Sequence, residues 1–394
     1  MVIILLIFPE YACKCISTLT SNGFDAYFVG GCVRDGLLSK KCDDIDITTN
    51  AHPKQIISLF EKTVPTGIKH GTVTVIIENH SIEVTTFRTE KGYSDARRPD
   101  EVNFVSSLAE DLSRRDFTIN ALACSEDGKI IDLFGGIKDL NDKIIRTVGP
   151  PNERFSEDAL RILRAYRFAS TLNFELEQDT NMAALILANN IEKISGERVL
   201  KELTKTANGL IPSAISGLVN TCVLKKFGIS ESKFCKQNFD KISTLSIDET
   251  YKFILMISLL NHNVNLMKNV LKVSNKIANH VAALDELSTK KAPENKTEIK
   301  HILYKYGVEN TRLYLYYLHI TDNSKSTNLF ELLDEILDNN EVFYIKQLAI
   351  NGSFLKKLGY SGKDIGLTLE KILFFVMEYN DRNNIDDICD FLKN

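Results

Sequence analysis

Residues 26–50, AYFVGGCVRDGLLSKKCDDIDITTN, decide the fold of the first part of the chain. The apolar residues 26–29 predict a strand that runs into Gly30 and Gly31, and a short helix is expected over 33–38. A strand, a glycine pair and a helix start leave backbone N–H groups free to bind phosphate, with no side chain in the way. A glycine pair alone is weak evidence for such a site.

A pair of acidic residues follows in Asp44-Ile45-Asp46. Side chains on a strand alternate between faces, so Asp44 and Asp46 are expected to point the same way while Ile45 and Ile47 point into a core. Neighbouring carboxylates repel each other as anions unless a divalent cation lies between them. A rigid oxygen pair of this kind can hold Mg²⁺ for phosphate chemistry. The glycine pair and the acids together therefore favour a phosphate site.

Composition limits the class of protein. A chain of 394 residues is too long for one ordinary core, and two to four domains are expected. Its 44% hydrophobic and 25% charged residues are typical of a soluble globular protein. The net charge of −4 means that contacts with nucleic acid must come from local basic patches, which weighs against a non-specific DNA-coating protein.

Cysteine usage and hydropathy indicate the compartment. The eight cysteines include no CxxC pair, and without a secretory signal we expect reduced thiols in the cytosol. The apolar start, MVIILLIF, is too short for a signal core or a membrane span. No later run reaches the length of a membrane span, so the prediction is a cytoplasmic protein without membrane contact.

The pattern of elements changes near Pro150-Pro151. Before it, strands and a few helices predict an α+β fold around a small mixed sheet. After it, nearly every segment has helical periodicity. Residues 88–102 form an aperiodic loop that is long enough to be functional. The elements predicted before the boundary are helices over 9–22, 53–62 and 108–124, strands over 72–77 and 81–87, and a strand, a Gly-Gly turn and a second strand over 130–149.

Three further groups could carry chemistry. Glu83, on the strand 81–87, is a candidate third carboxylate for a metal site, or else a solvated charge on a half-buried strand. In the predicted helix around EDLSRRDFTINA (110–121), Asp116 and Asn120 share a face, and one of two adjacent arginines can reach phosphates. The alternative is a surface helix with local ion pairs.

The helix predicted over 154–170 offers a way of reading bases. Asp158 and Arg161 stand at i and i+3, which places an acceptor beside a donor. Cytosine and adenine each present an amino donor next to a ring-nitrogen acceptor, so one such pair suits both. Uracil and guanine would meet acceptor with acceptor and donor with donor, which a site rejects strongly. The alternative is an ordinary salt bridge within the helix.

Several motifs occur in a fixed order along the chain and carry a resemblance to a known family. The chain resembles the bacterial and eukaryotic class of CCA-adding tRNA nucleotidyltransferases, within the polymerase-β-like nucleotidyltransferase superfamily. The motifs are GGCVRD (30–35), DIDITTNA (44–51), TGIKHGTVTV (66–75), EVTTFR (83–88), DLSRRDFTINA (111–121), GGIKDL (135–140), RFSEDALRILRAYRFA (154–169) and SGERVLKELTK (195–205).

This resemblance implies roles for individual residues. Asp44 and Asp46 would hold two Mg²⁺ ions, with Glu83 as a third acid. Asp158 and Arg161 would be the base-reading pair. The nucleotide-binding residues implied are Gly30, Gly31, Arg34, Arg114, Asp116, Asn120, Asp158, Arg161, Arg164 and Arg167.

The resemblance also implies supporting elements and a division of the chain. The loop 88–102 would be the flexible element that allows the change from C to A addition, and Glu197 and Arg198 would support the site from a helical neck. The residues of interest in the loop are Arg88, Tyr93, Arg97 and Arg98. The implied domains are a nucleotidyltransferase head (1–150), a neck (151–210), a body (211–290) and a tail that binds tRNA (291–394).

The activity implied is template-independent addition of C, C and A to the 3′ end of tRNA from CTP and ATP. The acceptor arm of tRNA and the nucleotides would be the partners, with no protein partner implied. An A-adding or CC-adding enzyme and a poly(A) polymerase of the same superfamily remain alternatives. A catalytically inactive RNA-binding protein is an alternative of another class.

Overall fold

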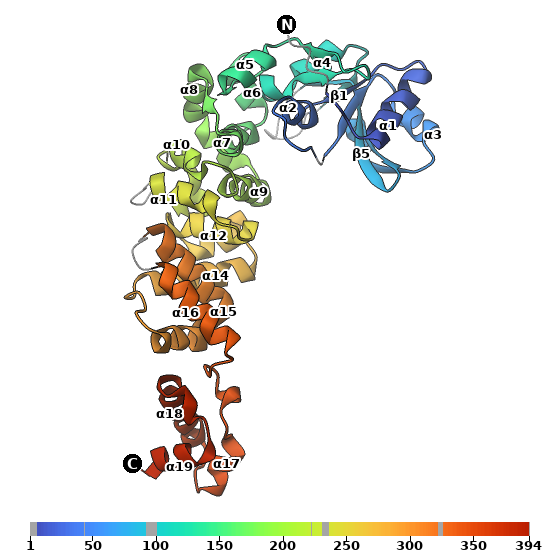
Figure 1. Ribbon diagram of the computed structural model, residues 1–394. Coiled ribbons are helices and arrows are strands. Elements are labelled where there is room, and N and C mark those ends of the chain that lie inside the picture. Colours follow the sequence, from blue (N-terminus) through green and yellow to red (C-terminus); the bar gives the residue numbers. More distant parts are fainter. Residues whose placement is uncertain are drawn as a thin grey trace. The chain divides into compact units, whose positions relative to one another are not determined.

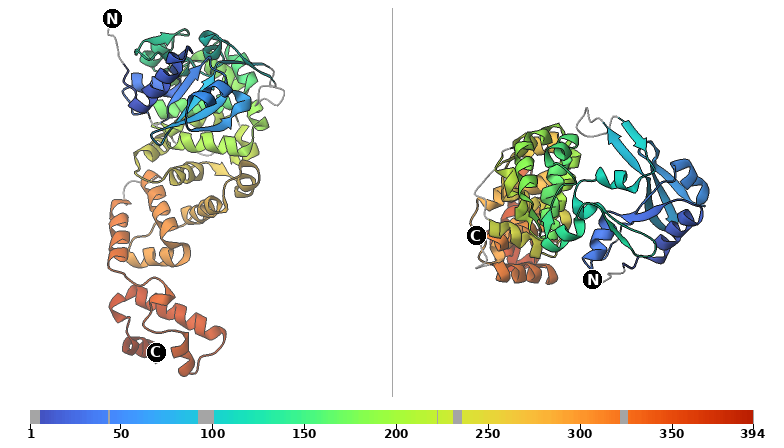
Figure 2. Two further views of the ribbon diagram at one scale, coloured as in Figure 1. Left: turned by 90° about the vertical axis from the view of Figure 1, so that its right-hand side faces the viewer. Right: turned by 90° about the horizontal axis from the view of Figure 1, so that it is seen from above.

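The computed structural model describes residues 6–42, 44–91, 101–221, 223–230, 236–321 and 326–393. The chain forms two compact units, residues 1–231 with 270–272 and residues 232–269 with 273–394 (Figures 1 and 2). The division between the units does not coincide with a boundary of the four predicted domains, which remain a prediction. Within the described part of the chain, no helix has the length and apolarity needed to cross a bilayer.

A mixed sheet of seven strands forms the framework of the first unit, in the order β3-β4-β5-β2-β1-β8-β9. Strand β2 runs parallel to β5, and the other neighbours are antiparallel. The parallel pair requires a crossover, which includes the helix α3 (Pro53–Leu59). The strands are β1 (Ala26–Val29), β2 (Asp46–Thr49), β3 (Thr63–Gly67), β4 (Thr72–Ile77), β5 (His80–Thr86), β8 (Leu122–Cys124) and β9 (Ile130–Asp132).

Helices cover the sheet as the apolar pattern requires. The helix α1 (Glu10–Ser21) buries Ala12, Cys15, Ile16 and Leu19, which recur at helical spacing. It packs with α3 on one face of the sheet (Figure 1). The helix α4 (Leu108–Ser113) contributes Leu112 to a cluster with residues of β1 and β8. The predicted α+β head is therefore confirmed.

The helix predicted over 108–124 is wrong beyond Ser113. A 3₁₀ turn, η2 (Thr118–Asn120), follows α4, and β8 then pairs with β1 inside the sheet. A short apolar run that is buried on every side has no polar face, so its periodicity does not separate a helix from a strand. The prediction for 130–149 is also partly wrong, because the helix α5 (Gly136–Asp142) begins directly after the glycine turn.

The continuous helix predicted over 154–170 is also wrong. The helix α6 (Pro151–Glu157) ends where Asp158 takes an extended conformation, with φ −138° and ψ 106°, and α7 (Leu160–Leu172) begins beyond it. One oxygen of Asp158 accepts a hydrogen bond from the backbone N–H of Leu160 at 2.9 Å. Aspartate side chains compete in this way with the backbone bonds of a helix. Asp158 and Arg161 therefore do not lie on one helix.

The remainder of both units is mainly helical, as predicted. In the first unit α7 packs against α9 (Gly196–Ala207). In the second unit the predicted linker 288–296 joins α14 (Asn275–Ser288) to α15 (Lys296–Thr321), and these helices pack together. The other long helices of the second unit are α12 (Glu249–Ser258), α16 (Ser326–Asp338), α18 (Lys363–Glu378) and α19 (Ile385–Lys393).

Candidate active site

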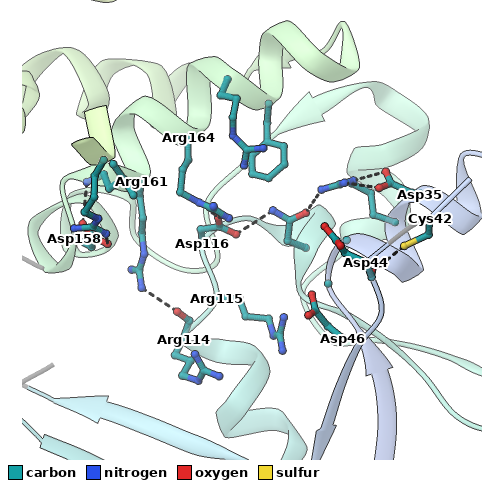
Figure 3. Close-up of a pocket in the computed structure, with 18 of the residues that line it drawn as sticks. Asp35, Cys42, Asp44, Asp46, Arg114, Arg115, Asp116, Asp158, Arg161 and Arg164 are labelled. Carbon is teal, nitrogen blue, oxygen red and sulfur yellow. Dashed lines mark hydrogen bonds and ion pairs between the residues drawn. The ribbon is translucent and has the colours of Figure 1, made fainter. Parts of the chain in front are cut away.

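An open cavity of about 670 Å³ lies in the first unit, and residues of α7 and α9 form part of its wall (Figure 3). Most of the predicted site residues line it. The lining residues are Gly30, Gly31, Arg34, Asp35, Lys41, Cys42, Asp44, Asp46, Arg114, Arg115, Asp116, Asn120, Asp158, Leu160, Arg161, Arg164, Arg167, Phe168 and Arg198.

The acidic pair enters the cavity from the start of β2. The strand begins at Asp46, and Asp44 lies in the bend before it, so the prediction that both acids stand on the strand is wrong. Both nevertheless line the cavity and lie close together in Figure 3. Ile45 and Ile47 are buried as expected. The two acids thus come from one short segment, although only Asp46 belongs to the ladder.

The negative charge of Asp46 is unfavourable in the folded protein. Burial, together with the nearby carboxylates of Glu83 and Asp44, raises its pKa to about 6 against the opposing effect of Arg115. A divalent cation beside Asp46 would offset this excess of negative charge. Mg²⁺ is commonly bound by one or two carboxylates together with phosphate oxygens of a substrate, so the pair fits such an ion.

Glu83 lies beside the pair without completing a protein cage for a metal. It stands opposite Asp46 in the register of β5 and β2, and both line a neighbouring cavity of about 240 Å³. Among the residues that the structure describes, no three histidine, cysteine or acidic side chains are placed to hold an ion together. The remaining ligands of a metal would therefore have to come from the substrate and water.

The turn between β1 and α2 (Gly31–Leu37) requires glycine at its first position. Gly30 has φ +72°, a region that side chains strongly disfavour. A Cβ atom there would lie 3.1 Å from Nη1 of Arg115 and 3.8 Å from a carboxylate oxygen of Asp46. The bare backbone thus leaves room for a guanidinium beside the acidic pair.

A chain of buried polar contacts crosses the wall of the cavity. Arg34 donates to both oxygens of Asp35 at 2.9 and 2.8 Å and to Oδ1 of Asn120 at 2.6 Å. Asn120 in turn donates to Asp116 at 3.0 Å, and Arg164 donates to the other oxygen of Asp116 at 2.7 Å. We call these five residues the Arg34–Arg164 network. The predicted proximity of Asp116 and Asn120 is therefore present, although no helix carries both.

The charges of the Arg34–Arg164 network are balanced. Burial alone would raise the pKa of Asp116, but Arg164 and the hydrogen bond from Asn120 outweigh it and hold that pKa well below its ordinary value. Asp116 therefore stays ionised at neutral pH. Its negative charge fixes the guanidinium of Arg164 at the edge of the cavity.

Both arginines of the RRD motif are braced by one buried acid, Asp111, which the sequence prediction missed. Arg114 donates to it at 2.7 Å and Arg115 at 3.3 Å, and the hydroxyl of Thr48 donates at 3.1 Å. Burial would raise the pKa of Asp111, but the two arginines hold it below its ordinary value. Arg114 and Arg115 stand three and four residues after Asp111, a spacing from which these ion pairs could have been predicted.

The two predicted base-reading residues have separate partners. Asp158 accepts a hydrogen bond from Nη2 of Arg198 at 2.9 Å. Arg161 pairs with Glu157 and donates to the backbone oxygen of Arg114 at 3.0 Å. The ordinary salt bridge between Asp158 and Arg161 is thus replaced by these contacts, and both side chains reach the cavity from different segments (Figure 3).

An aromatic ring, missed by the sequence prediction, supports three of the cationic side chains. The centroid of the Phe168 ring lies 5.1 Å from the guanidinium carbon of Arg34, 5.3 Å from that of Arg164 and 3.8 Å from that of Arg167. Such contacts are favourable when the cation is partly desolvated. A single aromatic residue in a helix gives no signal of this role.

Of the predicted loop and neck residues that the structure describes, Arg88 and Arg198 line cavities. The loop begins in β6 (Arg88–Lys91) and ends in β7 (Glu101–Phe104), which pair with each other. Arg88 lines the smaller cavity beside Glu83, whereas Tyr93, Arg97 and Arg98 lie outside the described residues. Arg198 lines the main cavity, and Glu197 is exposed in the first turn of α9.

Comparison with known proteins assigns the chain to a family. A family model described as the poly A polymerase head domain matches residues 26–146, and one described as tRNA nucleotidyltransferase domain 2 (putative) matches residues 246–392. A CCA-adding enzyme of Lactobacillus johnsonii is 40% identical over 396 residues, covering 96% of this chain and 95% of its own. The chain belongs to the CCA-adding enzymes.

Other CCA-adding enzymes agree with this assignment. That of Streptococcus gordonii is 36% identical over 400 residues, covering 98% of this chain and 97% of its own. The crystal structure of the Bacillus stearothermophilus CCA-adding enzyme in complex with CTP has 32% identity and a TM-score of 0.79, and covers 95% of this chain and 94% of that one. The predicted membership in this family of nucleotidyltransferases is confirmed.

Proposed function

We propose that this protein adds C, C and A to the 3′ end of tRNA from CTP and ATP, without a nucleic-acid template and with release of pyrophosphate. The observation that carries the proposal is that one cavity is lined both by the acidic pair and by Asp158 and Arg161, which can accept and donate hydrogen bonds to a base (Figure 3). The CTP complex of the related Bacillus stearothermophilus enzyme supports the choice of nucleotide.

The transfer is an attack of the terminal hydroxyl of tRNA on the α-phosphorus of the bound nucleotide, with pyrophosphate as the leaving group. Asp44 and Asp46 would hold the Mg²⁺ ions, which polarise the hydroxyl and offset charge on the phosphates when bound. Arg34, Arg115 and Arg164 line the cavity as fixed cations, because acidic partners or ring contacts hold each of them. They bind and orient the triphosphate before reaction.

Asp158 and Arg161 select the base. The carboxylate of Asp158 accepts one hydrogen bond at each oxygen, from Leu160 and Arg198, and each oxygen has a further lone pair for an amino group. Arg161 has five N–H donors, more than its three described hydrogen bonds require. The pair therefore matches the amino donor and the ring-nitrogen acceptor of C and A without giving up the contacts that position it.

The test is incorporation of each labelled nucleotide into tRNA that lacks CCA. Wild-type protein should add C, C and A in that order and discriminate against UTP and GTP. Asp158→Ala should lose at least about tenfold of this discrimination, since a site loses selectivity when its polar partner is removed. Asp127→Ala, at an exposed acid outside the cavity, is the matched control and should behave as wild type.

Each alternative activity has its own outcome in this assay. Addition of A alone, or of C and C alone, would identify an enzyme of partial activity, and long A tails on any RNA would identify a poly(A) polymerase. Binding of tRNA without any incorporation in Mg²⁺ would identify an inactive RNA-binding protein. Unchanged base selection by Asp158→Ala would refute the role of the Asp158–Arg161 pair.

A further inference from the structure

Two cysteines lie directly beside the acidic pair. Cys32 follows the glycine pair in α2 and is almost fully buried, whereas Cys42 lines the cavity and is half-buried. Their sulfur atoms contact backbone oxygens that are only two residues apart, those of Asp46 and Asp44, and the two thiols interact with each other. They are separated along the chain by the end of α2 and the turn after it, so tertiary folding brings the two thiols together.

Each thiol also holds the backbone of one of the acids. The sulfur of Cys42 donates to the carbonyl oxygen of Asp44 at 3.0 Å, and that of Cys32 lies 3.7 Å from the carbonyl oxygen of Asp46. Cys32 also contacts the carbonyl oxygen of Val29 at 3.2 Å. The reduced dithiol thus ties the segment that carries both acids to the end of β1.

We propose that Cys32 and Cys42 form a reversible disulfide under oxidation and that this bond suppresses nucleotidyl transfer. In the reaction with a peroxide, Cys42 attacks the O–O bond to give a sulfenic acid and water. The sulfur of Cys32 then displaces the second water molecule and forms the S–S bond. In total the two thiols lose two electrons and two protons, which the peroxide takes up as it is reduced to two molecules of water.

The bond is expected to disturb the acids for two reasons. A disulfide has no S–H group, so Cys42 no longer donates to the carbonyl oxygen of Asp44, and Cys32 no longer donates to that of Val29 or Asp46. A covalent S–S bond is also shorter than a contact between two thiols, and therefore draws residue 42 toward α2. Asp44 lies two residues farther along and moves with it. A displacement of about 1 Å at a reacting group can lower a rate by about 10²-fold.

The position of Cys32 and Cys42 beside the candidate active site suits a regulatory disulfide. Disulfides of cytosolic proteins are usually transient and serve catalysis or redox sensing. An accessible cysteine with a second cysteine beside it, which can resolve the sulfenic acid, is the arrangement expected of a sensor. The inference rests on the proposed transferase activity, because that activity is its readout.

The experiment uses the full-length protein, first fully reduced and then treated with hydrogen peroxide. Peptide mapping after alkylation of free thiols identifies the bonded pair, and addition of labelled CTP and ATP to tRNA lacking CCA measures transfer. We expect Cys32 and Cys42 to become linked, transfer to fall by at least about tenfold, and dithiothreitol to restore it. Each variant is compared with itself before and after oxidation.

Three variants separate this pair from the other thiols. Cys42→Ser and Cys32→Ser keep a donor but cannot form the bond, so their transfer should resist peroxide. The half-exposed position of Cys42 makes Cys42→Ser the safer of the two for folding. Cys389→Ser removes a thiol of α19 in the second unit and should respond to peroxide as wild type does.

Three outcomes would overturn the proposal: oxidation that links neither cysteine of the pair to the other, linkage with unchanged transfer, or equal inhibition of Cys42→Ser. Failure of the fully reduced protein to transfer any nucleotide would instead contradict the proposed function. Peptide mapping would still report on the disulfide in that case, so the two failures are distinguishable.

Discussion

Replacing Asp46 with asparagine is expected to stabilise the folded protein and abolish nucleotidyl transfer at the same time. Burial, with Glu83 and Asp44 nearby, raises the pKa of Asp46 from 3.8 to about 6. A tenfold change in acid strength corresponds to about 1.4 kcal/mol. The buried carboxylate therefore costs the folded state on the order of 3 kcal/mol at neutral pH.

The sign follows from where the proton is held more tightly. Because the pKa of Asp46 is higher in the folded than in the unfolded chain, the folded state binds the proton more strongly between about pH 4 and pH 6. The cost is absent below that window and complete above it. Asparagine carries no charge at any pH, so the variant should gain up to about 3 kcal/mol over wild type near pH 7.5 and almost nothing near pH 4.

The assay is urea unfolding in EDTA at both pH values, with Asp142→Asn as an exposed control that should stay within about 0.5 kcal/mol of wild type. Added Mg²⁺ should reduce the difference in stability between Asp46→Asn and wild type, since the ion stabilises only the wild-type site. At an Mg²⁺ concentration about ten times its Kd, this gain is about 1.4 kcal/mol. An Asp46→Asn variant that is no more stable than wild type near pH 7.5, or whose advantage is unchanged near pH 4, would refute the reasoning.

Three other perturbations test the site. The rate of transfer should fall below about pH 6 as Asp46 takes up a proton, and more Mg²⁺ should move the midpoint of the pH profile lower, because the ion favours the carboxylate. Gly30→Ala should lower the free energy of unfolding by about 1–3 kcal/mol and displace Arg115, which abolishes transfer. The control is Gly23→Ala, at φ +83° with open space around it, which should suffer only the backbone strain and keep transfer. Asn120→Leu removes the amide that Arg34 and Asp116 share and should lower the free energy of unfolding by about 3 kcal/mol in urea titrations. A loss below about 1 kcal/mol would contradict the importance of this amide.

Local spacing explains what could be predicted from the sequence. The alternation around Asp46 predicted buried isoleucines on either side, and the burial of Ile45 and Ile47 agrees with it. The change from strands to helices near Pro151 was likewise visible in the periodicity. The prediction wrongly placed Asp44 on the strand because a two-residue pattern does not reveal where the ladder with the neighbouring strand begins.

Contacts between distant parts of the chain explain what could not be predicted. The run that forms β8 is apolar throughout, so only its place between two other strands distinguishes it from a helix. The break at Asp158 depends on a local backbone contact and on Arg198, 40 residues farther along. The role of Phe168 similarly depends on Arg34, which belongs to another element.

The walls of the cavity come from stretches of the chain that leave the ribosome at different times. The glycine pair and the acids of β2 belong to the early part, whereas Asp158, Arg164 and Arg198 are made later. Synthesis proceeds from the N-terminus at about 5–20 residues per second. For several seconds a nascent chain therefore has the residues proposed to bind metal but not those proposed to choose the base. Selectivity is in this sense the last property of the site to be assembled.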